Sequence, residues 1–544
     1  MQIRVIVLIM LSISFGQAVV GLNTEKGLRQ DLPVVHIAHL DSGWYPQERL
    51  ALEKEVRDYL DAARRHFSVS VDAQSVRALV VPHAGFYYSG ACAAASYQTL
   101  WNGVDKNTSI KRVIVLAPSH RLLFNGCALA HFDEYKTPLG RIKIDKDAQK
   151  KLGQGAVFKG DYRAHWDEHA IEIQLPFLQT VVQDFMLVPL IIGHVNDETM
   201  HDIITGLKKI IDDTTLVVVS SDFVHHGDDF EYRVFNDSIM HGVRYLDSLA
   251  INHLCSQDYH AFEKTLKETG ATICGQNCLK LLLGLINEQA LPGLNARLAC
   301  YYTSAHVKQA RKNDAKKLAY DVLFKDVADE DARASVSYAA LIFTTQNYQN
   351  LSPEDRLTMY EKKSLLTFAR RVIEHDLSGK SAMPEHYLVP IVSYGMQLPV
   401  GVFVSINDAK GALRGCIGSI ESSTPLYESV LHMARQAAFH DTRFASIKKN
   451  DLGGIKITLS ILTKPTSIKD PKEIRLGTDG IIFNKVDKKG KVVASSVFLP
   501  KVPTEQKWNL QTTLEQLALK AGLTKNGWKS SGTFSTFQAF EIKE

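Results

Sequence analysis

Cysteine is scarce in this sequence, and its distribution excludes a disulfide-stabilised scaffold. Seven cysteines are spread over 544 residues, whereas disulfide frameworks place an even number of cysteines in a short secreted chain. The number and spacing of the cysteines fit free thiols or metal ligands better than disulfides. The cysteines are Cys92, Cys127, Cys255, Cys274, Cys278, Cys300 and Cys416.

Strong charge of one sign is also absent. Lysine and arginine number 63 and aspartate and glutamate 59, a formal net charge of +4. No basic tract with interleaved aromatic residues occurs, so the sequence gives no indication of nucleic-acid binding. We find no repeats and no low-complexity region. The 45% hydrophobic and 22% charged fractions are typical of a globular protein, and the length predicts two or three domains.

A long apolar run occurs only at the N-terminus. In "MQIRVIVLIMLSISFGQAVV", Arg4 precedes an apolar core that ends near Phe15, and the small residues Gly16 and Ala18 follow. This order predicts an export signal over residues 1–18, in a run too short to span a bilayer comfortably. A buried first strand or helix is the alternative. We expect an exported or periplasmic protein if the signal is cleaved and a cytoplasmic one otherwise. No later stretch predicts an integral membrane segment.

Apolar β-branched runs alternate with helical stretches over residues 32–345. This alternation is typical of a layered α/β domain. Amphipathic segments at 171–182 and 200–211 separate some of the runs. The strand candidates are 77–82, 112–118, 187–193, 215–221, 297–304 and 337–343.

The polar stretch at 346–354 interrupts this pattern and predicts a linker. Ser352, Pro353, Glu354 and Asp355 have the order of a helix start, with a serine cap, a proline in the first position and acids in the first turn. Beyond it, over 355–544, helices and strands do not alternate strictly, which favours an α+β domain. Helices are expected at 355–373, 426–439 and 512–521, strands at 401–406, 455–462, 480–486 and 495–500, and a hairpin turn at 487–491.

Polar side chains follow three strand candidates of the first domain. His83 follows "ALVVP", His120 follows "VIVLAPS" and Asp222 follows "TLVVVSS". Ligands of open α/β sheets gather beyond the carboxyl ends of the strands, and two imidazoles with a carboxylate suit a metal or an acid-base site. Each residue taken singly also fits a turn or helix cap. Their repetition at equivalent strand ends favours a site.

Three further candidates belong to the same region. His169 stands with Asp167 and Glu168 at the front of a helix in "HWDEHAIEIQLPFL", a position that also suits a plain acidic helix start. His225 lies in "DFVHHGDDF". Cys274 precedes a glycine at the start of a helical run, where backbone amides favour a thiolate. A structural cysteine is the alternative there.

These motifs resemble the Memo family. "VVPHAGFYYSG", "VLAPSH", "DEHAIEIQLPFL", "VVVSSDFVHHG", "TICG" and "ASVSYAALIF" occur in that family's order and approximate spacing, and "HLDSGWYP" (39–46) is similar to its opening stretch. The resemblance implies the fold of class III extradiol dioxygenases, which are non-haem iron enzymes. It also implies a metal site of His83, His120 and Cys274, with Asp222 beside it and with His225 and His169 lining the cleft.

The implied ligand set does not choose one metal. Imidazole and thiolate are compatible with iron or copper and with zinc, and we expect iron or copper, with no organic cofactor. The cysteine is softer than the carboxylate of the dioxygenases, so ring cleavage is not implied. Gln276 and Asn277 stand where the Memo pattern commonly has arginine and histidine, and "VHHG" replaces a Cys-His-Trp-Gly stretch. The substrate therefore stays open.

The second domain has its own candidate site. In "GALRGCIG", glycines flank Arg414 and Cys416. This arrangement suits a site for an anion or a reactive thiolate, and the alternative is a tight strand corner. "AAFHDTRF" adds Asp441 and Arg443, which equally suit a salt-bridged helix end.

These motifs, with "FLPKVPTEQKWN" and "ALKAGL", resemble the AMMECR family, whose activity is not established. The tandem resembles the AmmeMemoRadiSam grouping, which implies a radical SAM protein as partner.

Three functions follow from the sequence. The first is a metal-dependent redox or dioxygenase-like enzyme with Asp222, His225 and His169 as catalytic groups. The second is a binding module for a peptide or small ligand. The third is a scaffold that docks a partner enzyme.

Overall fold

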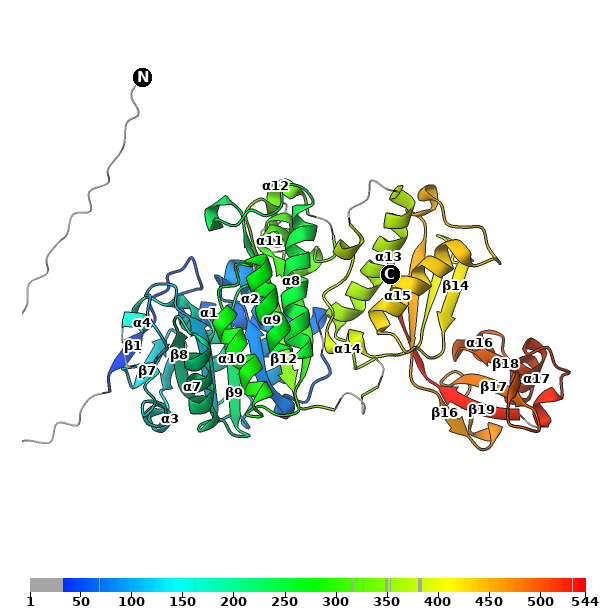
Figure 1. The fold of residues 1–544 in the computed structure, drawn as a ribbon, viewed down its shortest axis with the longest axis horizontal. Coiled ribbons are helices and arrows are strands. Elements are labelled where there is room, and N and C mark those ends of the chain that lie inside the picture. Colours follow the sequence, from blue (N-terminus) through cyan, green and yellow to red (C-terminus); the bar gives the residue numbers. More distant parts are fainter. Residues whose placement is uncertain are drawn as a thin grey trace, which may run out of the picture.

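A computed structural model describes residues 33–544 apart from 68, 160, 162, 313, 315–316, 326, 348–350, 353, 380–383 and 531. Figure 1 shows the first domain in blue to green and the second in yellow-green to red. The predicted export signal over 1–18 lies outside the described residues, as do 348–350 and 353 of the predicted linker. None of the helices in the described part of the chain combines the length and apolarity that crossing a membrane requires.

A mixed nine-stranded sheet forms the centre of the first domain, in the order β10-β12-β2-β9-β3-β8-β4-β7, with β11 paired to β12. Its four central strands run parallel. Their side chains are almost all buried, which explains why they are continuous apolar runs rather than alternating ones. These strands are β2 (Val76–Val81), β9 (Thr215–Ser220), β3 (Arg112–Pro118) and β8 (Met186–Ile192).

The remaining strands of the first domain lie at the sides of these four or in a separate three-stranded sheet, β1-β5-β6. The long strands β11 and β12 confirm the last two strand candidates of the sequence. The bounds are β10 (His225–His226), β11 (Asn295–Thr303), β12 (Ser335–Thr344), β4 (Cys127–Ala128), β7 (Phe158–Lys159), β1 (Val35–Ile37), β5 (Glu134–Thr137) and β6 (Gly140–Lys143).

Helices pack against this sheet and against one another. Helix α2 contacts α1, β2 and β12, whereas α10 contacts β3, β9 and α9. The expected helix at 171–182 is instead two short helices, α5 and α6, because Pro176 has no N–H and is tolerated only in a first helical turn. The helices are α1 (Arg49–His66), α2 (Phe86–Tyr97), α3 (Lys146–Leu152), α4 (Arg163–Trp166), α5 (His169–Glu172), α6 (Leu175–Val181), α7 (Asp197–Lys208), α8 (Ile239–Ser256), α9 (Tyr259–Thr269), α10 (Gln276–Asn287), α11 (Ser304–Arg311) and α12 (Asp329–Ala332).

The second domain contains two four-stranded antiparallel sheets, β14-β13-β15-β20 and β16-β19-β17-β18. Helix α13 contacts β15 and β20, and α15 contacts β13, whereas α17 contacts β18 in the other sheet. Figure 1 shows α13 and α15 beside the first of these sheets. The strands are β13 (Val402–Asn407), β14 (Leu413–Ser419), β15 (Lys456–Leu462), β16 (Thr466–Ile468), β17 (Gly480–Val486), β18 (Val492–Phe498), β19 (Gly532–Phe537) and β20 (Ala539–Lys543).

The turn at 487–491 joins β17 to β18 as expected, with Gly490 at φ 79°. The predicted helix at 426–439 is α15 followed by a π-helical turn at Gln436–His440. The helices of this domain are α13 (Met359–Ser378), α14 (Tyr394–Gln397), α15 (Leu426–Arg435), α16 (Lys501–Glu505) and α17 (Leu510–Lys520).

The first helix of the second domain begins later than the sequence predicts. Ser352 does accept a hydrogen bond from the Asp355 backbone, but the result is a single turn. Helix α13 starts at Met359, where Thr358 and Glu361 form a capping box. The predicted start was wrong because this box satisfies both orphan N–H groups reciprocally.

The same capping box joins the two domains. Strand β11 has a register shift between Leu298 and Cys300, and the second domain bonds to the backbone groups of Leu298. The N–H of Leu298 donates to Glu361 Oε1 (3.3 Å), and the carbonyl of Leu298 accepts from Thr358 Oγ1 (2.8 Å). Burial raises the pKa of the fully buried Glu361, and the neighbouring buried Arg297 acts against that rise.

Helix α8 contacts both domains. Arg244 donates to the Tyr387 carbonyl, and Asn252 Oδ1 accepts from the Val392 N–H (2.7 Å). From the same helix, Asp247 accepts hydrogen bonds from the Val224 N–H (3.0 Å) and from the Tyr301 hydroxyl (2.7 Å). Asp247 therefore anchors the loop after β9, which carries Asp222 and His225.

Glu361→Ala should lower the free energy of unfolding by about 3 kcal/mol. It leaves two buried N–H groups without their acceptor and the buried Arg297 without a counter-charge. Glu354→Ala is the matched control, because the exposed Glu354 forms a long ion pair of 3.9 Å with Lys362, worth about 1 kcal/mol or less. Urea denaturation of both variants measures this. Equal effects would show that the capping box does not stabilise the junction.

Asp247 should make stability fall as pH rises from 5 to 7. Burial raises its pKa from 3.8 to about 6, so between these values the folded state holds a proton that the unfolded state has lost. This contribution to the unfolding free energy is complete below the unfolded pKa and is lost as pH rises through the folded one. Relative to Asp247→Asn, the wild type should lose about 1 kcal/mol between pH 5 and pH 7. Parallel pH dependences in urea denaturation would contradict this.

Candidate metal centre

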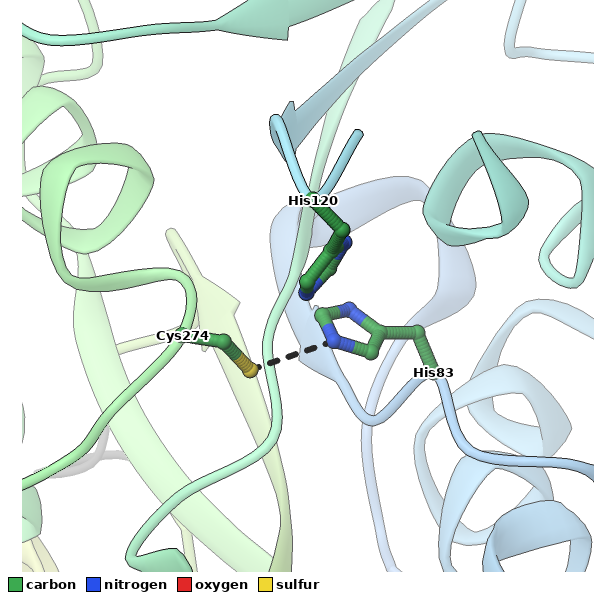
Figure 2. A group of neighbouring side chains, drawn as sticks. All are labelled: His83, His120 and Cys274. Atoms are coloured by element: carbon green, nitrogen blue, oxygen red, sulfur yellow. Dashed lines mark hydrogen bonds between the residues drawn. The ribbon is translucent and has the colours of Figure 1, made fainter. Parts of the chain in front are cut away.

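Three parallel strands bring their carboxyl ends to one edge of the sheet. Strand β9 lies between β2 and β3, so His83, His120 and Asp222, which follow these strands, converge. Cys274 reaches them from the loop before α10. Figure 2 shows the two imidazoles and the sulfur facing one another. One donor atom from each of His83, His120 and Cys274 lies within 4.8 Å of the other two.

The protonation of His83 is set by Ser220. The Ser220 hydroxyl donates its proton to the Ala170 carbonyl (2.6 Å) and accepts from Gln174 Nε2 (3.0 Å). Because that proton is committed, His83 Nδ1, 3.0 Å from Ser220 Oγ, must donate. Burial lowers the pKa of His83 well below its usual value, and His120 adds to this. His83 is therefore neutral, and its Nε2 lone pair points at Cys274 Sγ, 3.2 Å away.

His120 is held in the same way by Glu168. Its Nδ1 lies 2.8 Å from Glu168 Oε1, and its backbone N–H donates to Oε2 (2.7 Å). Burial alone would raise the pKa of Glu168, but the bonds from His120 outweigh it and hold that pKa below its ordinary value. The ionised carboxylate accepts a hydrogen bond from Nδ1–H of His120. This leaves the Nε2 lone pair available to a metal, which is the usual arrangement of a metal-binding histidine.

Cys274 is positioned by a close backbone approach. A Cβ on Gly275 would lie 2.4 Å from the side chain of Ser221, so only glycine fits there. The structure corrects the expectation that the helix start favours a thiolate. Burial and the Asp222 charge raise the pKa of Cys274 far above its usual value, and the nearby backbone amides do not offset them. The thiol is protonated without a metal.

Asp222, His225 and His169 surround this group. Burial raises the pKa of Asp222 to about 6, and its Oδ1 accepts the His83 backbone N–H (2.8 Å). One donor atom each from Asp222, His225 and Cys274 lie within 4.8 Å of one another. Burial and His120 lower the pKa of His169 to about 4, and its Nδ1 has no hydrogen-bond partner among the described residues, although Glu168 Oε1 lies 3.3 Å away.

A buried glutamate fixes the N-terminal stretch over the cleft. The fully buried Glu172 accepts from the backbone of His39 and Leu40 and from the Tyr45 hydroxyl. This places the Trp44 ring against His169, with centroids 4.8 Å apart. The "HLDSGWYP" stretch therefore forms a wall of the site, and its displaced histidine, His39, pairs with Glu172 (2.9 Å).

Sequence reasoning missed the residues that orient the donors. The sequence indicates Glu168 only as a helix-start acid, and it does not single out Gln174 or Glu172. The available signal was the set of polar residues in "DEHAIEIQ". Glu168, Glu172 and Gln174 are all buried in the structure, whereas a plain acidic helix start would expose at least some of them.

The second-domain candidates come together only in part. Asp441 accepts the Cys416 N–H (2.8 Å) and two hydrogen bonds from the guanidinium of Arg443, which also donates to the Cys416 carbonyl (2.7 Å). These bonds hold the pKa of Asp441 far below its usual range, and the hydrogen bonds from the Arg443 side chain make the largest contribution. Arg414 instead pairs with Asp451 (3.6 Å). The group is a salt-bridged support for β14.

The first-domain donors fit a transition metal. The two imidazoles have their Nδ1 atoms engaged by Ser220 and Glu168, and the Cys274 thiol completes the set. Nδ1 of His169, a buried nitrogen without a hydrogen-bond partner among the described residues, lies beside them. Nitrogen and sulfur donors of this kind suit iron, copper or zinc.

Comparison with known proteins agrees with the motifs. The family described as Memo-like protein matches residues 38–320, and AMMECR1 matches residues 366–542. The human and rat proteins named MEMO1 are each 28% identical over 286 residues, which is 51% of this chain and 92% of theirs. A memo-1 homolog of Caenorhabditis elegans is 30% identical over 250 residues, 44% of this chain and 68% of its own.

One solved structure, of the uncharacterized protein PH0010 from Pyrococcus horikoshii, is 29% identical, with a TM-score of 0.29 over 33% of this chain and 89% of that one. The family matches cover half of this chain with one family and most of its remainder with another. The chain belongs to the Memo family and carries an AMMECR1 domain after its Memo domain.

Proposed function

We propose that the protein is a metal-dependent redox enzyme of dioxygenase-like type, with the metal held by His83, His120 and Cys274. The observation that carries the proposal is the shared orientation of the two imidazoles. Ser220 and Glu168 each engage an Nδ1–H, so both Nε2 lone pairs are available on the side of Cys274 Sγ. Hydrogen bonds that fix the tautomer in this way are typical of metal sites.

The donor set is compatible with iron, copper and zinc, and the proposed redox function requires iron or copper. Zinc does not change its oxidation state. Bound there, such a metal would supply electron transfer to or from a reduced substrate or oxygen. We also propose that the first domain has the layered fold of the dioxygenases. The proposed reaction requires no organic cofactor.

The remaining side chains supply proton transfer and orientation. Asp222, with a pKa of about 6, can accept or release a proton at Oδ2 near neutral pH and can orient a water molecule or substrate group. His169, whose pKa is lowered to about 4, is neutral at that pH, so it can orient a substrate group or a water molecule by hydrogen bonding. His225 is the other acid-base candidate. Trp44 limits the access of water to His169.

A second function, recognition of a peptide or small ligand without chemistry, is favoured by one observation. The protonated Cys274 thiol and the neutral His83 already form a hydrogen bond with each other, so this pair does not need an ion to satisfy it. A radical SAM partner for this protein rests on the tandem of the two domains.

Anaerobic reconstitution with Fe²⁺ tests the metal function. The wild type should retain close to one iron per chain after gel filtration, with a paramagnetic signal on addition of nitric oxide. His83→Ala, His120→Ala and Cys274→Ala should each weaken binding at least about tenfold, because each removes a ligand. His201→Ala is the control, since His201 is exposed and pairs with Glu288. An iron-free wild type, or variants that bind as it does, would favour the recognition function.

Glu168→Gln tests the orientation of His120. The amide can no longer act as an ionised acceptor for Nδ1–H, so iron affinity should fall by about 10- to 100-fold. The matched control is Asp167→Asn, because Asp167 is the exposed neighbour in the same turn. Competition with a chromophoric chelator measures both affinities. If the two variants bind iron equally well, Glu168 has only a structural role.

A further inference from the structure

A second cavity lies where the two domains meet, and the residues that line it are different from those of the metal cleft. Its volume is about 50 Å³. A cavity needs about 10 to 15 Å³ to hold one water molecule, so this one has room for a few waters or one small anion. Both domains contribute to its lining. The polar lining residues that matter here are His306, Arg244 and Lys325 from the first domain and Tyr360 and Arg371 from the second.

The charge of this lining has one sign. Arg244, Lys325 and Arg371 are cationic, and none of the described residues that line the cavity is acidic. Burial raises the pKa of Tyr360, and both Arg244 and Arg371 oppose that rise, so the two guanidinium charges act on the same hydroxyl. Arg244 belongs to α8 and Arg371 to α13. The docking of the two domains therefore brings two cations to one place, where an anion would interact favourably with both.

His306 adds a neutral hydrogen-bond donor to these charges. Its Nδ1 accepts the Thr303 N–H (3.2 Å) in the capping box of α11. A backbone N–H only donates, so Nδ1 carries no proton and Nε2–H is the donor that the ring can offer to the cavity. A guanidinium has five N–H donors and no acceptor. Arg244 donates one of them to the Tyr387 carbonyl, which fixes the side chain at the junction.

We propose that this cavity binds a phosphate group between the two domains, with Arg244 and Arg371 as its main ligands. Donors from three helices, α8, α11 and α13, suit the oxygens of a tetrahedral anion better than the planar pair of a carboxylate, and arginine binds phosphate oxygens in pairs. Apolar residues such as Phe324 and Leu388 line the rest of the cavity, and low local polarity strengthens charge-assisted hydrogen bonds. The ligand is free orthophosphate or the phosphate of a small monoester, and it holds the domains together.

Isothermal titration calorimetry of the full chain, metal-free and in phosphate-free buffer, tests this site with inorganic phosphate and with methyl phosphate. The wild type should bind one phosphate per chain. Arg371→Gln and Arg244→Gln should each weaken binding at least about tenfold, because each removes charge-assisted hydrogen bonds. Lys363→Gln is the matched control, since Lys363 is an exposed cation on the same helix as Arg371. It should bind phosphate as the wild type does, and so should His83→Ala, because the metal cleft takes no part.

Urea denaturation with and without phosphate separates binding from folding. Phosphate should raise the unfolding midpoint of the wild type and of Lys363→Gln by mass action and leave that of Arg371→Gln nearly unchanged. Arg244→Gln is the second variant should Arg371→Gln not fold. Tighter binding of inorganic phosphate would support the site with the free ion as its ligand, and tighter binding of methyl phosphate would support it with a monoester. A wild type that binds neither, equal affinities of Arg371→Gln and Lys363→Gln, or acetate that binds as tightly as phosphate would each overturn the proposal.

Discussion

The cleft depends on hydrogen bonds at the Nδ1 atoms of its histidines. Ser220 accepts from His83, Glu168 from His120 and two backbone carbonyls from His225. Each bond leaves Nε2 as the only free nitrogen of its ring. The acceptors lie on β9, the turn before α5 and the loops after β9 and before α10, so the order of the strands, which brings these segments together, decides the protonation of the site.

Burial opposes the ionisation of the donor groups. Burial raises the pKa values of Asp222 and Cys274 and lowers that of His83, so it favours the neutral form of every group. A cation reverses this for the two acids because it compensates their charge. The same low polarity therefore disfavours uncompensated charge in the pocket and strengthens the interaction of its donors with an ion.

The sequence was sufficient for the strands of the first domain and for the residues at their ends. Continuous β-branched runs have no helical alternative of the same length, and polar residues after such runs stand out. The supporting residues could not be predicted, because Ser220 and Glu168 act through contacts across 137 and 48 positions of the chain, respectively. The start of α13 was missed because Ser352 and Thr358 offer two caps, and the register of β11 against Thr358 decides between them.

The irregular edge of β11 links the two domains. Next to its register shift, the N–H and the carbonyl of Leu298 bond to Glu361 and Thr358 of the second domain. A first domain without its neighbour would expose this irregular strand, together with the buried side chain of Arg297, to water. The stability of the first domain therefore depends on the second, which must present a matching acceptor and donor to this strand.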